Sequence, residues 1–175
     1  MYEYADLAGV RSIRLLELLS YSKSRTTLTI RLKEVDLDDF PVFDALSYAW
    51  EGQAANEGII CDGNELLISS TCKAALRRLR HNVRNRFLWI DQICINQSSE
   101  REKIQQVILM ADVYNRAKRV IVWLGVSPES VRLLRNVRLY YLFGLCELVI
   151  PGLGKFWFQL RMSKRLEYRM KCQFL

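Results

Sequence analysis

The chain has 175 residues, of which 50% are hydrophobic, and a formal net charge of +7 at pH 7. Its five cysteines contain no Cys-x-x-Cys pair and there is one histidine, so the composition excludes a disulfide framework and a structural zinc site. Residues 1–125 hold 17 Lys and Arg against 16 Asp and Glu, which places the positive charge in residues 126–175 and argues against nucleic-acid binding by the first part.

Four β-strand signals come first along the chain. Residues 13–18 (IRLLEL) and 28–35 (LTIRLKEV) are predicted strands, and the second alternates apolar with polar residues. Such alternation indicates one buried and one wet face, as in an antiparallel hairpin. Residues 43–50 (FDALSYAW) form a third predicted strand. Asp62-Gly63, between IIC and ELLI, is typical of a tight two-residue hairpin turn.

A helix and a further strand are predicted next. Residues 87–93 (FLWIDQI) are a nearly continuous apolar run, which is typical of a strand covered on both sides. The preceding residues 71–81 have the periodicity of an amphipathic helix. Its apolar residues share one face and are Cys72, Ala75, Leu76 and Leu79.

The next predicted helix runs from about residue 99 to 118. Ser99 and Glu102 have the S-x-x-E spacing of a capping box. Apolar residues then recur every three or four positions, which predicts the buried face of an amphipathic helix. They are Ile104, Val107, Ile108, Ala111, Tyr114 and Ala117. Residues 120–124 (VIVWL) follow as another apolar strand.

The alternation of strands and helices predicts an α/β fold. Strands joined through a helix are paired in parallel by right-handed crossovers. We therefore expect an open sheet with a mainly parallel core, flanking helices and an N-terminal antiparallel hairpin. Residues 1–125 are the predicted core, and residues 126–175 a basic helical tail of the same domain, with amphipathic spacing from 130 to 142.

Polar side chains gather where two predicted strands end. Ser47, Tyr48 and Trp50 end one strand, and Asp91 ends another. In open parallel sheets, ligand sites form beyond the carboxyl ends of the strands. These residues are therefore candidates for ligand binding or recognition, together with those that follow Asp91, which are Cys94, Asn96 and Gln97.

A structural explanation exists for each of these candidates. Asn96 and Gln97 can cap the following helix and close its turn. Trp50 at a strand end can be a core residue, and Asp91 can accept backbone N–H bonds. Both explanations stay open at the level of the sequence.

Three kinds of chemistry are excluded by spacing. A Cys–His dyad would pair Cys94 with His81, but seven strand residues at about 3.3 Å each separate the two. One histidine and scattered cysteines give no metal-ligand spacing, so no metal site is expected. Neither G-x-G-x-x-G nor G-x-x-x-x-G-K occurs.

Three blocks of the sequence resemble the signature of the heterokaryon incompatibility (HET) domain of filamentous fungi. They are DALSYAWEG (44–52), LWIDQICINQSSEREKIQQVILMADVY (88–114) and AKRVIVWLG (117–125). Order, spacing and identity agree over roughly residues 13–125. The matching polar positions include Ser47, Tyr48, Asp91, Asn96, Gln97 and Glu102, and the resemblance adds Glu102 to the candidates for ligand binding or recognition.

The resemblance is weaker after residue 125. HET domains normally continue into a block similar to W-F-x-R-x-W-x-x-Q-E, and the nearest stretch here is FWFQLRMSKRLEY. Trp157 and Phe158 fit that block, whereas Ser163 and Leu166 replace its second Trp and its Gln. Glu51, inserted between Trp50 and the following glycine, is a smaller departure.

Because HET domains are similar to Toll/interleukin-1 receptor (TIR) domains, the resemblance implies a TIR-like or flavodoxin-like sheet. Some TIR domains cleave NAD with a glutamate, and here Glu167 is the residue that matches that position. It is the catalytic candidate, and its alternative is an exposed charge in a basic helix. NAD is thus a possible substrate, and no cofactor is expected.

The resemblance implies a role in fungal nonself recognition. The first hypothesis is a signalling and interaction module that binds protein partners or self-associates and triggers programmed, incompatibility-type cell death. The alternatives are a TIR-like NAD hydrolase and a truncated, nonfunctional remnant. With no signal peptide, no segment long enough to span a membrane and no nucleic-acid motif, we expect a cytoplasmic protein.

Overall fold

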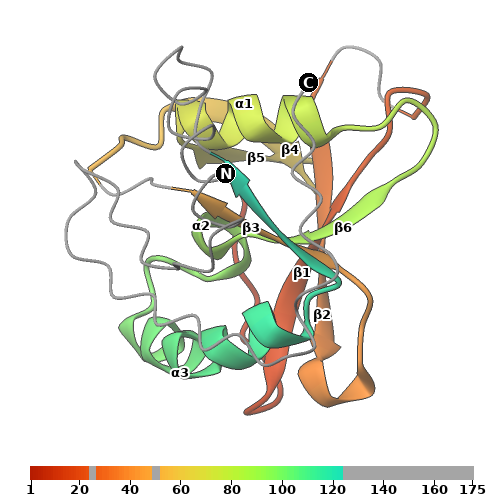
Figure 1. Cartoon of the computed structure of the whole chain (residues 1–175). Helices are drawn as coiled ribbons and strands as arrows, with labels where there is room; N and C mark the ends of the chain where they lie inside the picture. Colours follow the sequence, from red (N-terminus) through yellow and green to blue (C-terminus); the bar gives the residue numbers. More distant parts are fainter. Residues whose placement is uncertain (24–26, 49–51, 124–175) are drawn as a thin grey trace, which may run out of the picture. The chain divides into compact units, whose positions relative to one another are not determined.

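The computed structural model describes residues 1–23, 27–48 and 52–123 (Figure 1). Within them, one sheet has the strand order β5-β4-β2-β1-β6-β3-β7. The strands are β1 (Ser12–Leu18), β2 (Thr29–Asp36), β3 (Asp44–Tyr48), β4 (Glu57–Cys61), β5 (Asn64–Ile68), β6 (Arg86–Trp89) and β7 (Arg119–Trp123). The helices are η1 (Leu37–Asp39, a 3-10 turn), α1 (Ser70–Leu79), α2 (Asp91–Cys94) and α3 (Glu100–Arg116).

The sheet is mixed, so the α/β class is confirmed and the mainly parallel core is wrong. Antiparallel ladders join β1 to β2, β1 to β6 and β4 to β5 through 7, 3 and 5 residue pairs. The parallel ladders, of β2 with β4, β6 with β3 and β3 with β7, contain 2, 2 and 5 pairs. The prediction failed because β1 lies between β2 and β6 and runs against both. All seven residues of β1 are buried, as expected for a central strand.

Both predicted hairpins form. The β1–β2 ladder extends from Ser12 opposite Asp36 to Leu18 opposite Ile30. Between β4 and β5, Asp62 and Gly63 have φ angles of 47° and 85°. Positive φ at both central residues is typical of the type I′ turn, whose twist matches that of the strands it joins.

The predicted strand at residues 87–93 ends earlier than expected. β6 stops at Trp89, and Asp91 to Cys94 form the helical turn α2. The N–H of Cys94 donates to the carbonyl of Ile90 over 2.7 Å, which closes that turn. Ile90 and Ile93 are fully buried, and a short apolar run does not distinguish a strand from a buried helical turn.

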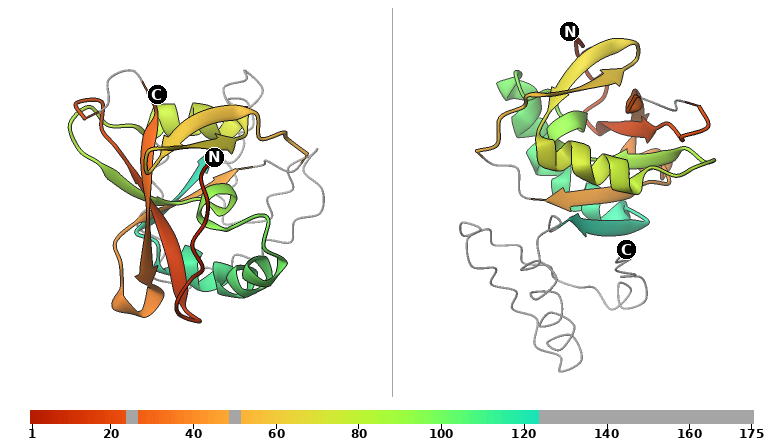
Figure 2. Two further views of the ribbon diagram at one scale, coloured as in Figure 1. Left: turned by 180° about the vertical axis from the view of Figure 1, so that it is seen from behind. Right: turned by 90° about the horizontal axis from the view of Figure 1, so that it is seen from above.

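Helices α1 and α3 lie on opposite sides of strands β3 and β6 (Figure 1). Figure 2 gives two further views of the same arrangement. In α1 the predicted face is inside, because Cys72, Ala75 and Leu76 are fully buried. Ser69 caps its N-terminus by accepting a hydrogen bond from the N–H of Cys72.

The predicted face of α3 is wrong over most of its length. Three of its apolar side chains face outward, Ile104, Val107 and Ile108, at 64%, 60% and 75% exposure. The inner face consists instead of Glu102, Gln106, Leu109 and Val113. Ser99 caps the helix by accepting from the N–H of Glu102, but the Glu102 carboxylate bonds elsewhere, so only half of the predicted capping box forms.

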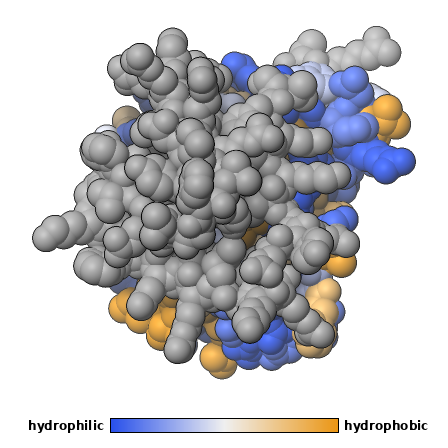
Figure 3. Space-filling model, viewed as in Figure 1, coloured by the Kyte–Doolittle hydropathy of each residue, from blue (hydrophilic) through white to orange (hydrophobic). Residues whose placement is uncertain are grey.

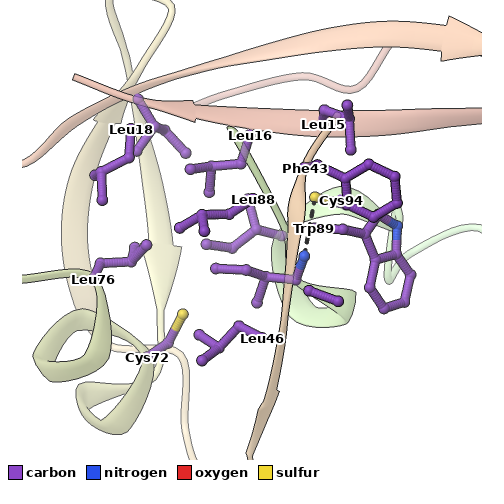
Figure 4. Packing of buried hydrophobic residues seen from close by; sticks show 14 of the residues in the cluster. Leu15, Leu16, Leu18, Phe43, Leu46, Cys72, Leu76, Leu88, Trp89 and Cys94 are labelled. Atoms are coloured by element: carbon purple, nitrogen blue, oxygen red, sulfur yellow. Dashed lines mark hydrogen bonds between the residues drawn. The ribbon is translucent and has the colours of Figure 1, made fainter. Parts of the chain in front are cut away.

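Apolar side chains from both helices and the sheet fill the core. Figure 4 shows Leu16, Leu46 and Leu88 from three strands beside Cys72 and Leu76 from α1. Trp89 is fully buried and meets Tyr114 of α3 edge-to-face, with ring centroids 5.5 Å apart. None of the helices in the described part of the chain has the length and apolar composition needed to cross a membrane.

Candidate functional site

The carboxyl ends of β3 and β6 meet at one rim of the sheet. The two strands are parallel neighbours, with Asp44 opposite Leu88 and Ala45 opposite Trp89. Tyr48, the last residue of β3, therefore lies beside the turn that follows β6. Its hydroxyl donates a hydrogen bond to Gln92 Oε1 over 2.7 Å.

Gln92 connects this rim to helix α1. Its Oε1 also accepts from the backbone N–H of Ser69 over 3.3 Å and from the Ser69 hydroxyl over 3.1 Å. The same serine caps α1, so one buried amide oxygen receives donors from β3 and from the helix start. We call Ser47, Tyr48, Ser69, Asp91 and Gln92 the rim cluster.

Ser47 and Tyr48 reach opposite sides of the sheet, because successive side chains of a strand point to opposite faces. Tyr48 lies near Ser69 and Cys72 at the start of α1, whereas Ser47 lies near the hydroxyl of Tyr114 from α3. The rim therefore presents hydroxyl groups in both layers. This is the convergence of separate segments that the strand-end argument predicts.

Asp91 raises the pKa of tyrosines on both sides of the sheet. Its Oδ1 accepts the N–H of Gln92 over 2.7 Å at the start of α2. Burial raises the pKa of Tyr48, and Cys72 and then Asp91 raise it further. Burial is also the main cause of the raised pKa of Tyr114, with Asp91 next. Both phenols consequently stay protonated, and the single O–H of Tyr48 is donated to Gln92 Oε1.

Glu102 lies below the rim as part of a buried ion pair. Its two carboxylate oxygens accept from the guanidinium of Arg14 over 2.5 and 3.0 Å, and Oε1 also accepts the N–H of Asn96 over 2.7 Å. Burial opposes the charge of Arg14, but the hydrogen bond to Glu102 raises its pKa. Arg14 also donates to the carbonyl of Cys94 over 3.2 Å. This pair therefore fixes the segment that joins α2 to α3.

Asn96 and Gln97 close the same segment with their side chains. Asn96 Oδ1 accepts from the N–H of Ser98 over 3.1 Å, and Gln97 Nε2 donates to the carbonyl of Asp91 over 2.9 Å. These contacts fit the structural explanation, in which both residues hold a turn.

Cys94 has no features of a nucleophile. It is fully buried, and its sulfur accepts from the N–H of Ile90 over 3.4 Å. Burial raises the pKa of its thiol to about 12. The thiolate, which is the reactive form, is therefore disfavoured.

The structure thus divides the sequence candidates into two groups. It brings Ser47, Tyr48 and Asp91 together at the rim. Four other candidates make contacts that hold the segment from α2 to α3 in place: Cys94, Asn96, Gln97 and Glu102. Trp50 and Glu167 lie outside the described residues.

Sequence reasoning missed Ser69, Gln92 and Arg14. Ser69 has a readable signal, since a serine directly before an amphipathic helix is typical of an N-cap. Gln92 was hidden inside a run interpreted as a strand, and Arg14 inside a strand with apolar neighbours. No local pattern pairs Arg14 with Glu102, which is 88 positions away.

The rim is partly exposed at Ser47, Tyr48 and Asp91, while Ser69 and Gln92 are buried. Its phenols are held un-ionised, and Asp91 keeps a hydrogen bond to its own turn. Across residues 1–23, 27–48 and 52–123, no group of three or more His, Cys, Asp or Glu side chains is placed to hold a metal ion.

Comparison with known proteins gives one family. The family model described as heterokaryon incompatibility protein (HET) matches residues 43–141. Heterokaryon incompatibility protein 6, OR allele, of Neurospora crassa is 38% identical over 133 residues, which cover 67% of this chain and 19% of that protein. The chain therefore spans about a fifth of this relative's length. No solved structure matches.

Proposed function

Because this chain belongs to the heterokaryon incompatibility (HET) family, we propose that it acts in fungal nonself recognition, as a signalling and interaction module that triggers incompatibility-type cell death. The chain covers about a fifth of its curated relative. The activity of a whole incompatibility protein is therefore proposed for this chain. Residues 1–125 are its proposed core. A cytoplasmic location and a protein partner belong to the proposal as well.

One observation carries the proposal, namely that the family's sequence blocks meet in space. The blocks at 44–52, 88–114 and 117–125 contain the adjacent strands β3, β6 and β7 in the order β6-β3-β7. Their polar residues converge at the carboxyl-end rim, where Tyr48 bonds Gln92. A set of fixed hydrogen-bonding groups at one rim supports recognition of a partner.

The preorganisation of the rim supports the same interpretation. Each rim residue is held by a neighbour, as in the three donors that meet at Gln92 Oε1. A surface that is ordered before binding loses less side-chain entropy when the partner arrives. The buried ion pair of Arg14 and Glu102 holds the neighbouring segment between α2 and α3 in place.

The TIR-like architecture and NAD cleavage stay predictions of the family resemblance. The candidate acid, Glu167, lies outside the described residues, and burial keeps the described phenols of Tyr48 and Tyr114 un-ionised. Recognition is therefore the function that the described geometry supports best.

The test is inducible expression of the chain in a filamentous fungus, with viability as the readout. We expect cell death with the parent chain, and at least a tenfold higher survival with Tyr48→Phe or Asp91→Asn. Asp39→Asn is the matched control, because it is the same chemical change at an exposed site on η1. A cooperative melt of each purified variant excludes unfolding as the cause.

Two outcomes contradict the proposal. Full killing by both rim variants would show that the rim does not carry the activity. Release of nicotinamide from NAD by the purified chain, lost in Glu167→Ala, would show that the chain is an NAD hydrolase rather than a recognition module.

A further inference from the structure

Helix α3 carries an aliphatic stripe on the side that faces away from the sheet. Four residues form it at positions i, i+3, i+4 and i+7, and three of them are exposed by more than half. The fourth, Ala111, is exposed as well. Figure 3 shows apolar (orange) atoms at the lower left, where α3 lies in Figure 1. We call this set the outer stripe: Ile104, Val107, Ile108 and Ala111.

The outer stripe is unusual because its members are contiguous. Single exposed aliphatic side chains are normal, whereas a continuous apolar strip along a helix marks a contact surface. Each Å² of apolar surface removed from water stabilises a contact by about 25 cal/mol. A partner that covers the stripe is therefore favoured.

We propose that the occupant is a second copy of this chain, whose α3 packs antiparallel against the first. In that register Ile104 lies opposite Ala111 of the second copy, and Val107 lies opposite Ile108. A large side chain meets a small one at each end, and two branched side chains meet in the middle. The stripe is thus complementary to itself, as a twofold interface requires.

The charges beside the stripe fit the same register. Arg101 and Asp112 are about three helical turns apart and so lie along the same flank. Arg101 is exposed and has no hydrogen bond or ion pair among the described residues. Asp112 is half-exposed and uses one oxygen, Oδ2, for Arg11 at 2.9 Å.

Antiparallel packing brings Arg101 of each copy beside Asp112 of the other. The twofold axis repeats the contact, so one interface gains two opposite-charge pairs. Parallel packing in register would instead leave each Arg101 about three helical turns from Asp112 of the other copy, so these pairs would not form. Charge therefore selects the antiparallel orientation.

The size of the stripe sets the expected strength. One helix pair buries less than the ~1,600 Å² of a standard stable interface. We expect a weak dimer that dissociates on dilution. This inference goes beyond the proposed function and does not rest on it, since mass in solution is measured rather than cell death.

The test is sedimentation equilibrium of the full chain over a hundredfold concentration range. The average mass should rise from 20.5 kDa towards twice that value as concentration increases. Ile108→Glu should hold the mass at the monomer value throughout. Val83→Glu is the matched control, because Val83 is 70% exposed in the turn before β6, and it should dimerise like the parent chain.

A charge exchange separates self-pairing from non-specific association. Arg101→Glu alone and Asp112→Lys alone should each weaken dimerisation about tenfold. The double variant Arg101→Glu/Asp112→Lys should recover most of that loss, since both pairs are restored with reversed sign. Melting curves confirm that every variant is folded.

Three results would overturn the inference. The first is a parent chain that stays monomeric across the range, which would assign the stripe to another part of the chain or to another protein. The second is a dimer unaffected by Ile108→Glu. The third is a charge exchange that fails to recover dimerisation.

Discussion

Helices α1 and α3 have similar apolar spacing in sequence, but their apolar faces differ in burial. That of α1 faces the core, and most of that of α3 faces outward. In α1 the apolar face is inside, with Cys72, Ala75 and Leu76 fully buried. In α3 the inner face includes Glu102 and Gln106, while the aliphatic outer stripe faces outward. The same kind of pattern thus led to one correct and one wrong assignment.

The difference arises from the polar or apolar groups that the strands place against each helix. Beside α3, strand β1 presents Arg14, whose charge is balanced by Glu102. The carbonyl of Ser12 accepts from Gln106 Nε2 over 2.9 Å. The pairing of Arg14 with Glu102 and of Gln106 Nε2 with Ser12 offsets part of the cost of burying these groups, whereas Gln106 Oε1 has no hydrogen-bond partner among the described residues. Amphipathicity therefore identifies two faces of a helix, and the partner decides which face is covered.

The largest effect is expected from breaking the polar inner face of α3. Glu102→Ala leaves Arg14 buried without its counter-charge, which should lower the free energy of unfolding by about 3–5 kcal/mol. Chemical denaturation measures the loss. Glu100→Ala is the matched control, since the exposed Glu100–Lys103 pair should contribute less than about 1 kcal/mol.

The double variant Arg14→Met/Glu102→Leu sharpens the same point. Two apolar side chains of similar volume remove the charge problem, so part of the loss should be recovered. A double variant less stable than Glu102→Ala would mean that the pair acts mainly through its bonds to the 94–96 backbone.

Substitution on the apolar inner face of α1 should also lower the stability of the protein, here through the loss of packing. Leu76→Ala removes a fully buried side chain and should cost about 2–5 kcal/mol, with the midpoint of urea unfolding as the measure. Leu67→Ala, at the 36% exposed Leu67 of β5, should cost clearly less. Equal losses at the two sites would contradict the core position of α1.

The helix caps should differ according to their surroundings. Ser69→Ala removes the cap of α1 and a donor to Gln92, whereas Ser99→Ala removes only the cap of α3. We expect losses of about 2 kcal/mol and about 1 kcal/mol, within the usual range for N-caps. Thermal melting distinguishes them. A larger loss for Ser99→Ala would mean that the rim contributes little stability.

The smallest effect is expected on the outer stripe. Ile108→Gln should change the unfolding free energy of the dilute protein by less than about 0.5 kcal/mol, because the side chain is 75% exposed. The measurement is denaturation at low protein concentration, where the proposed dimer is dissociated. A loss above 2 kcal/mol would place Ile108 in a core.

Several parts of the fold were predictable from the sequence because their causes are local. The Asp62-Gly63 turn, the strands up to β5 and the Ser99 cap of α3 follow from φ preferences, alternation and the S-x-x-E spacing. For the site, the convergence of Tyr48 with the segment after β6 was also predicted, since parallel strands end at one rim. The roles of Asn96, Gln97 and Glu102 were not separable from recognition until their contacts were known.

The sequence by itself determined where most strands and helices form, the turn chemistry and the family blocks, because these depend on residues close together in the chain. Only the tertiary structure decided that β1 lies between β2 and β6, that Arg14 meets Glu102, and that α3 turns its aliphatic side outward. Such choices depend on which distant contacts offset the entropy of closing the loops between them. No window of neighbouring residues contains that balance.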